Sequence, residues 1–341
     1  MCGIIGVWGN GPVIRDIYQG LLAIQHRGQD SAGVITFDGR FHAKKGNGLV
    51  HDIFTPEAVQ SLRGPIGLGH TRYPTIGGGS GEDAQPFQLN SPFGLIMAHN
   101  GNVANYRELR DELYREHHRL LNSDCDVEII LNFFAESLAR EKTRALEPQH
   151  VFRAVEAVFR KVRGSYSVVA YVADQGLVAF RDPYGIKPLV AGVRRDGLLP
   201  SYAFASETVS LNIMNFGEIR DIEAGEVFIR LHRRPFGAST VPLGLELIEP
   251  ELFFRFHPPV ALEAEQPHVP ILMRDRGVKQ TDRPRRFRCR PRSNLVFFKE
   301  TDFDIGMQTQ VVSQCGSNNS AANYTYPNFF LHVISPFPSK I

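Results

Sequence analysis

The sequence predicts an α+β fold in which helices cover antiparallel sheets. Three observations favour this fold. Over residues 1–232 the strand-like segments fall into two groups, and so do the helix-like segments. Most strand-like segments follow one another after short turns, which antiparallel neighbours allow and parallel neighbours do not. Residues 233–341 lose this periodicity where arginines and prolines become frequent, so we assign no fold to this tail.

Short apolar runs bounded by turn residues predict the strands. They are expected at residues 2–9, 31–39, 40–48, 66–73 and 93–102 in the first group, and at residues 165–174, 176–182, 188–197, 202–207 and 225–231 in the second. The pair at residues 31–48 is typical of a hairpin, because Asp38 followed by Gly39 favours its turn. A glycine-rich loop at residues 75–86 separates the last two strands of the first group.

Apolar residues at helical spacing predict four helices, at residues 13–24, 105–117, 126–140 and 151–162. Pro12 lies just ahead of the first helix, where its fixed φ suits a helix start, and Gly164 follows the last. His117 and His118 close the second helix. Because no further ligand lies at a useful spacing, we expect a solvated helix end there and no metal site.

Composition restricts the class of protein. The chain has 341 residues, of which 43% are hydrophobic and 22% charged, as in soluble globular proteins. Its four cysteines form no CxxC pair, which excludes a disulfide framework or a zinc site of that type and suits a reducing cytoplasm. No apolar run approaches the roughly 18 residues of a membrane span, so no membrane is expected as a partner. A net charge of +2 is too small to indicate nucleic acid.

Cys2 is the first candidate catalytic residue. Once Met1 is removed, this residue carries both a thiol and an α-amine, whose ordinary pKa values are about 8.5 and about 7.7–8.0. The amine can take the thiol proton and later protonate a leaving ammonia, so no histidine is required. Gly3 leaves space around the nucleophile. A cysteine near a terminus is commonly incidental, so the assignment depends on the other motifs.

Acyl transfer also needs hydrogen-bond donors for the oxyanion of its tetrahedral intermediate. The stretch HNGN at residues 99–102, expected on the turn after a strand, offers an asparagine amide and a glycine backbone N–H. An amino-acid substrate further needs charge partners. Arg72 can bind an α-carboxylate through two hydrogen bonds, and an aspartate can bind an α-ammonium.

Seven motifs occur in one order along the chain. They are MCGIIGVWG at residues 1–9, QHRGQDSAG at 25–33, GHTRYPT at 69–75, AHNGN at 98–102, SDCDVEII at 123–130, RDPYGIKPL at 181–189 and ASET at 205–208. Together they resemble the glutaminase domain of class II glutamine amidotransferases, which are N-terminal nucleophile hydrolases, and within that family the amidophosphoribosyltransferases of purine biosynthesis. The resemblance covers residues 2–232 and implies a four-layer αββα sandwich of two antiparallel sheets.

The resemblance also implies a role for each matching residue in the catalysis of glutamine hydrolysis. Cys2 would be the nucleophile that forms a thioester with glutamine, and its freed amine would be the base. Asn100 and the backbone N–H of Gly101 would form the oxyanion hole. No metal takes part in this chemistry, and no cofactor is implied for this domain.

Substrate binding is implied for five further positions. Arg72 would hold the carboxylate of glutamine and Asp126 its ammonium, while Asp124 is a rival for the second role. Thr75 would contact substrate from a mobile glycine-rich loop. Arg27 and Gly28 would line the site.

Amidophosphoribosyltransferases continue into a phosphoribosyltransferase domain that binds phosphoribosyl pyrophosphate with Mg²⁺. Residues 233–341 match none of its motifs, as expected for a truncated or frameshifted coding sequence, so we expect Mg²⁺ only together with that domain. We therefore expect the glutaminase half of such an enzyme, located in the cytoplasm and binding glutamine. A homo-oligomer is one assembly that the sequence leaves open. Two alternatives remain: a free-standing amidohydrolase of the same fold, and a non-catalytic binding or regulatory fragment.

Overall fold

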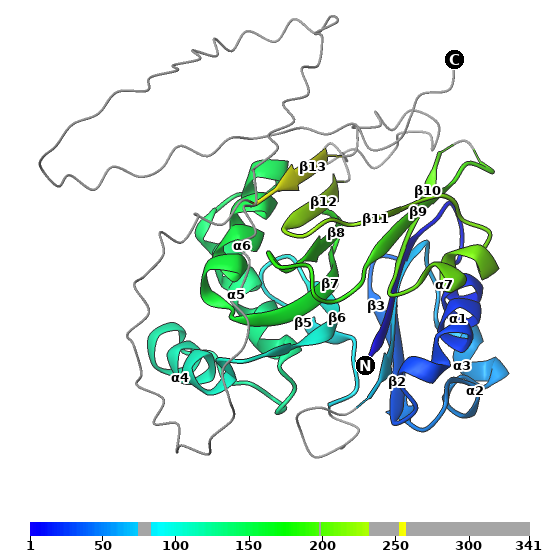
Figure 1. The fold of residues 1–341 in the computed structure, drawn as a ribbon, viewed down its shortest axis with the longest axis horizontal. Coiled ribbons are helices and arrows are strands. Elements are labelled where there is room, and N and C mark those ends of the chain that lie inside the picture. Colours follow the sequence, from blue (N-terminus) through cyan, green and yellow to red (C-terminus); the bar gives the residue numbers. More distant parts are fainter. Residues whose placement is uncertain (74–82, 198, 232–251, 257–341) are drawn as a thin grey trace, which may run out of the picture. The chain divides into compact units, whose positions relative to one another are not determined.

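The computed structural model describes residues 1–73, 83–197, 199–231 and 252–256. Two sheets lie at the centre of this part of the chain (Figure 1). In spatial order, the first sheet contains β11 (Gly217–Asp221), β9 (Val190–Arg194), β10 (Ser201–Ala205), β1 (Gly3–Trp8), β4 (Ile66–Arg72), β2 (Ser31–Phe37) and β3 (Phe41–Asn47). The second contains β13 (Leu252–Arg255), β12 (Glu226–Leu231), β8 (Gly176–Arg181), β7 (Gly164–Val172), β6 (Leu95–Val103) and β5 (Phe87–Leu89).

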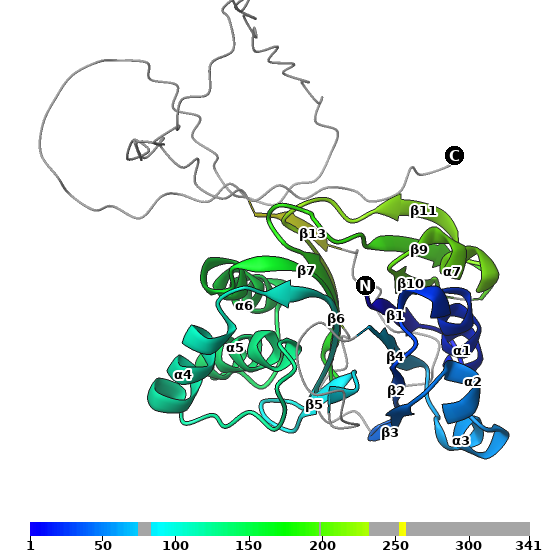
Figure 2. The ribbon, with the colours of Figure 1, turned by 60° about the horizontal axis from the view of Figure 1, so that its bottom comes forward.

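Helices cover the outer face of each sheet, as Figure 2 shows. On the first sheet lie α1 (Ile14–Ala23), α2 (Val50–Ile53), α3 (Pro56–Ser61) and α7 (Thr208–Ile213). On the second lie α4 (Tyr106–His117), α5 (Val127–Arg140) and α6 (Pro148–Lys161). All the strand pairs in the described residues are antiparallel. The expected α+β sandwich with four αββα layers is therefore confirmed.

Three apolar cores separate these four layers. Ile4 and Leu68 belong to the core between the two sheets. Ile5, the neighbour of Ile4, points the opposite way and packs with Ile17 of α1 in the core under the first helical layer. The third core joins α5 and α6 to the second sheet and includes Phe134. Because β1 is buried on both faces, its sequence is apolar throughout, which is why the strand was predictable.

Several expected elements differ from the observed ones. The sequence places HNGN at residues 99–102 both at the end of a strand-like segment and on the turn after it; it lies within β6, where Asn100 pairs with Ser167 of β7. Helix α6 begins at Pro148, three positions before the expected start, with the proline in its first turn. β13 lies inside the tail that the sequence left unassigned, and pairs with β12. The rest of that tail lies outside the described residues.

His117 is also placed differently from expectation. The sequence indicated a solvated histidine, but the His117 side chain is only 10% exposed. Its ring packs edge-on against Phe133 of α5, at 6.0 Å between ring centroids. His118 is exposed, as expected, and ends α4 with a φ of 53°. None of the helices in the described part of the chain is long and apolar enough to cross a bilayer.

Candidate active site

Cys2 lies immediately before β1, a central strand between β4 and β10. Its side chain is 8% exposed, and its Sγ atom lies 3.6 Å from the backbone oxygen of Tyr73. Burial raises the pKa of the Cys2 thiol, although a hydrogen bond with the Tyr73 backbone and the nearby positive amino terminus act in the opposite direction. A thiol in this state needs a base before it can attack a carbonyl carbon.

Arg27 holds the backbone of Cys2 in place. The Nε atom of Arg27 donates a hydrogen bond of 2.9 Å to the carbonyl oxygen of Cys2. One of its terminal nitrogens lies 2.6 Å from a carboxylate oxygen of Glu207. Arg27 belongs to the short 3-10 helix Gln25–Arg27, and Glu207 precedes α7. Arg27 and Glu207, 180 positions apart in the sequence, thus hold the residue that precedes β1.

Gly28 lies directly against the end of β4. A Cβ atom at this position would be 2.5 Å from the carbonyl carbon of Arg72 and 2.6 Å from that of Thr71. These atoms are backbone, so they cannot move aside without displacing the strand. The backbone of Gly28 is extended (φ −160°), a conformation that any residue can adopt. The requirement for glycine therefore comes from the crowding by β4 and not from the backbone conformation.

Arg72 is the last residue of β4 and is 3% exposed. Its guanidinium lies 3.3 Å from a carboxylate oxygen of Asp83 and 3.5 Å from one of Asp30. A buried charge of this kind is costly unless it is paired, and these two carboxylates supply that pairing. The two carboxylates also fix the direction of the guanidinium, which the sequence analysis predicts to bind the carboxylate of glutamine.

Asn100 and Gly101 lie side by side on β6. The Asn100 side chain is 1% exposed, and its amide nitrogen has no hydrogen-bond partner among the described residues. A Cβ atom on Gly101 would lie 2.4 Å from the carbonyl oxygen of Ser165. β6 contacts both β1 and β4 across the two sheets. The predicted oxyanion residues therefore lie on the strand that faces the strands of Cys2 and Arg72.

Asp126 occupies the position before α5 and is 4% exposed. One carboxylate oxygen lies 3.2 Å from Nε2 of His99, and the other accepts a hydrogen bond of 2.9 Å from the backbone N–H of Val103. Burial alone would raise the pKa of Asp126, but His99 and the Val103 N–H together hold it below its ordinary value. Its rival Asp124 is exposed, so burial favours Asp126.

His99 connects these groups. Its backbone N–H donates to the side-chain oxygen of Gln85 at 2.8 Å, so the Gln85 amide nitrogen is the donor to Nδ1 of His99 at 3.0 Å. The ring proton of His99 therefore lies on Nε2, facing Asp126. Nε2 of His70, on β4, lies 3.2 Å from the His99 carbonyl oxygen and links the two sheets. Burial, reinforced by the neighbouring His99, lowers the pKa of His70 to about 3.

Thr75 lies outside the described residues, so its predicted contact with substrate stays a prediction. The sequence did not single out five charged or polar partners, namely Asp30, Asp83, Gln85, His99 and Glu207. Asp30, His99 and Glu207 lie inside motifs already quoted, QHRGQDSAG, AHNGN and ASET, and Asp83 and Gln85 lie near the end of the glycine-rich loop at residues 75–86. The motifs therefore contained three of these residues, but the sequence did not show which side chains they contact.

Comparisons with known proteins agree with this arrangement. Residues 70–212 match the family described as glutamine amidotransferase domain. The chain is 46% identical over 228 residues to the amidophosphoribosyltransferase of Haemophilus influenzae, and 47% identical over 229 residues to that of Escherichia coli. Each match covers 66% of this chain but only 45% of the relative. The chain therefore matches less than half the length of these relatives.

Two solved structures share the fold. One is the glutamine phosphoribosylpyrophosphate amidotransferase of Bacillus subtilis complexed with ADP and GMP, with 26% identity and a TM-score of 0.57. The other is described as the allosteric regulatory enzyme of purine biosynthesis, with 27% identity and a TM-score of 0.58. Each match covers 67% of this chain and 47% of the other. The chain thus contains a glutamine amidotransferase domain with the N-terminal nucleophile hydrolase fold, homologous to the amidophosphoribosyltransferases.

Proposed function

We propose that this domain hydrolyses glutamine to glutamate and ammonia through a thioester on Cys2. The observation that carries the proposal is the buried amide nitrogen of Asn100, which has no hydrogen-bond partner among the described residues. Leaving such a donor unpaired costs about 1–3 kcal/mol, which a substrate oxygen would recover. An oxyanion that forms next to this nitrogen would be stabilised as the reaction proceeds.

The mechanism begins with removal of Met1, which exposes the α-amine of Cys2. This amine accepts the thiol proton, and the thiolate attacks the side-chain carbonyl carbon of glutamine. The carbonyl oxygen becomes an oxyanion held by Asn100 and by the backbone N–H of Gly101. When the C–N bond breaks, the protonated amine gives its proton to the leaving ammonia. Water then attacks the thioester, releases glutamate and restores the thiol.

Recognition of a free amino acid accounts for the two buried charges. Arg72 would bind the α-carboxylate, because its guanidinium is fixed by Asp83 and Asp30. Asp126 would bind the α-ammonium, because its carboxylate stays ionised at neutral pH. Thr75 and Gly28 would complete the contacts with substrate. An amidohydrolase for other amides would need neither charge.

The test is glutamate release from glutamine by the full chain, followed together with its intact mass before and after reaction with diazo-oxonorleucine. We expect a mass without Met1, one adduct on Cys2 and steady glutamate release. Asn100→Ala should lower kcat by about 100- to 1000-fold. Asn102→Ala is the matched control, because Asn102 is an exposed residue of the same strand. A processed chain that takes no adduct and releases no glutamate would overturn the proposal in favour of a non-catalytic fragment.

Substrate preference distinguishes the proposed glutaminase from a free-standing amidohydrolase of the same fold. A glutaminase should lose activity when the α-amine of glutamine is acetylated or its carboxylate is amidated. A chain that hydrolyses such derivatives as well as glutamine would be an amidohydrolase of the same fold.

The transfer of ammonia to phosphoribosyl pyrophosphate requires that this domain be joined to a phosphoribosyltransferase domain. We assign it to the glutaminase half of an amidophosphoribosyltransferase, which passes ammonia to phosphoribosyl pyrophosphate in purine biosynthesis. The reduced thiol that this mechanism needs supports a location in the cytoplasm. The assay is phosphoribosylamine formation from glutamine, phosphoribosyl pyrophosphate and Mg²⁺. Glutaminase activity without this product would limit the chain to the first half-reaction.

A further inference from the structure

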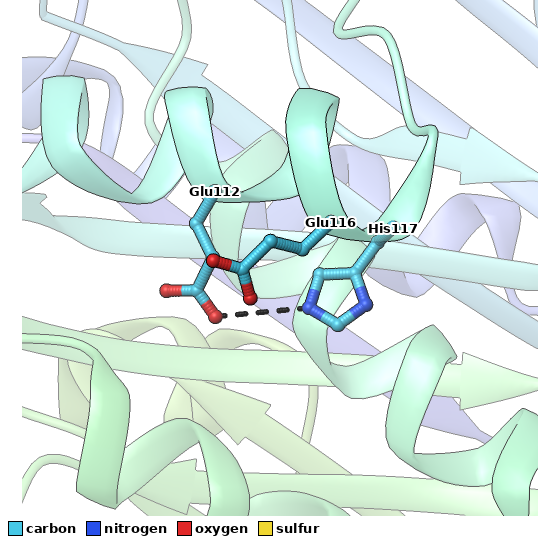
Figure 3. A group of neighbouring side chains, drawn as sticks. All are labelled: Glu112, Glu116 and His117. Atoms are coloured by element: carbon cyan, nitrogen blue, oxygen red, sulfur yellow. Dashed lines mark ion pairs between the residues drawn. The ribbon is translucent and has the colours of Figure 1, made fainter.

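The C-terminal turns of α4 bring three metal-binding side chains together, away from the site of Cys2. One ligand atom each from Glu112, Glu116 and His117 lies within 4.8 Å of the others. Figure 3 shows the two carboxylates and the imidazole directed toward a common point beside the helix. The glutamates are four positions apart and therefore lie on the same helix face.

His117 supplies the observation that points to a ligand. Its side chain is 10% exposed, and its Nε2 atom is buried without a hydrogen-bond partner among the described residues. Nε2 lies 3.7 Å from a carboxylate oxygen of Glu112. This separation is too long for a hydrogen bond. It is close to the roughly 3.3 Å that separates two ligands of one tetrahedral zinc ion, given metal–ligand bonds of about 2.0–2.1 Å.

The other ring nitrogen of His117 has the environment of a metal-ligating histidine. Nδ1 lies 3.6 Å from a carboxylate oxygen of Glu136 on α5. Glu136 is itself held by Arg119, whose Nε atom lies 3.2 Å from it. The separation of 3.6 Å between Nδ1 and Glu136 is that of an ion pair and not of a hydrogen bond. A carboxylate in this place behind the imidazole still favours a ring orientation in which the second nitrogen can face a metal. The ring is further fixed by its edge-on contact with Phe133.

One cation already competes for this site. The ammonium of Lys161, on α6, contacts the same Glu112 oxygen and lies 5.1 Å from the centre of the Phe133 ring. The Lys161 side chain is 41% exposed, so its flexible stem can carry the ammonium into solvent. A divalent ion between the carboxylates of Glu112 and Glu116 would replace the single positive charge of Lys161 with two positive charges.

We propose that Glu112, Glu116 and His117 form a zinc site with one position open to water. One imidazole nitrogen and two carboxylate oxygens are a ligand set that Zn²⁺ accepts, and its fourth position is open to solvent on the side of the exposed Glu116. The ion takes no part in the chemistry at Cys2. Because its three ligands all belong to α4, it holds the last turns of that helix together and stabilises the folded chain by mass action.

The experiment is a zinc titration of the full chain, stripped of metal, against a chromophoric chelator. His117→Gln should weaken zinc binding more than tenfold, whereas His118→Gln, the same change at the exposed neighbour, should leave it unchanged. The difference between these variants removes any contribution from cysteines and histidines elsewhere in the chain. Equal zinc affinity of the His117→Gln and His118→Gln variants would overturn the proposal.

Further variants keep the test independent of folding. Glu116 is exposed, so Glu116→Gln leaves the packing intact and should still weaken zinc binding, with Asp111→Asn as its matched control on the same helix. Lys161→Gln should tighten binding, because it removes the competing ammonium. Zinc should raise the thermal unfolding midpoint of the unmodified chain more than that of the Glu116→Gln variant. An equal shift in both would show that zinc binds elsewhere and would refute the site.

Discussion

Asp126 joins both ends of the segment that carries the predicted oxyanion residues. One of its carboxylate oxygens lies 3.2 Å from Nε2 of His99, and the other accepts the backbone N–H of Val103 at 2.9 Å. Asn100 and Gly101 lie between these two contacts. The residue assigned to the ammonium of glutamine therefore also positions the strand assigned to its carbonyl oxygen, so substrate binding and oxyanion stabilisation share one support.

Asp126→Asn tests this double role. The substitution keeps the size of the side chain but removes its charge, so the KM for glutamine should rise about 10- to 100-fold, as expected for the loss of a hydrogen bond to a charged group. Chemical denaturation should also show a loss of stability, because His99 loses its buried partner. Steady-state kinetics provide the check, with Asp124→Asn as the exposed control. A normal KM in a destabilised variant would reduce Asp126 to a structural role.

Gly28→Ala tests the contact between the turn at residue 28 and the end of β4. The added methyl group would lie 2.5 Å from the carbonyl carbon of Arg72, so β4 must shift and carry the guanidinium with it. We expect glutamine binding, measured by the rate of diazo-oxonorleucine labelling at limiting reagent, to fall at least tenfold. Gly11→Ala is the matched control, because nothing lies within 4 Å of its added methyl group. Equal labelling rates in the two variants would contradict the assignment.

Arg27→Lys tests whether the guanidinium positions Cys2. A lysine carries a single point charge and cannot bind the Cys2 carbonyl and Glu207 at once in the geometry of an arginine. Losing one hydrogen bond of about 1.4 kcal/mol should lower kcat about tenfold, with a smaller effect on KM. Arg15→Lys, at an exposed position of α1, is the control. A kcat equal to that of the control would show that Cys2 is held without Arg27.

Local sequence patterns predicted the elements whose own residues determine them. The strand β1 is apolar on both faces, and the helix α5 has a continuous apolar side, so both were found close to their observed bounds. Asparagine and glycine favour a turn at HNGN, although the strand-like run at residues 93–102 includes it; the pairing of Asn100 with Ser167 decides for the strand. β13 is a short, isolated stretch that begins with three apolar residues, and its pairing with β12 is what makes it a strand.

The site was predictable to a similar extent. Motif order identified Cys2 and Asn100, since each stands in a distinctive stretch of sequence. The partners that hold the site were not predictable, because a side chain's role here depends on a contact across the fold. Arg27 and Glu207 lie 180 positions apart, and no spacing in the sequence brings them together.

His70 should make the stability of the domain depend on pH. Its pKa is lowered to about 3 in the folded chain, first by burial, while an unfolded histidine titrates near 6.5. Below about pH 6.5 the unfolded chain therefore binds a proton that the folded chain does not, so stability is fully present above this pH and is lost as the pH falls toward 3. The slope is at most about 1.4 kcal/mol per pH unit, or about 2 kcal/mol between pH 7 and pH 5.

Urea unfolding at pH 7 and pH 5 measures this loss. His70→Gln retains a side-chain N–H for the His99 carbonyl but cannot titrate, so its stability should change by about 2 kcal/mol less than that of the unmodified chain over this range. His118→Gln, the same change at an exposed position, is the matched control. If the His70→Gln variant does not fold, the ring nitrogen shifts of labelled histidine in the unmodified chain report the same quantity. A His70 ring that takes up a proton between pH 7 and pH 5 in the folded chain would contradict the prediction, because burial between the two sheets is what keeps it neutral.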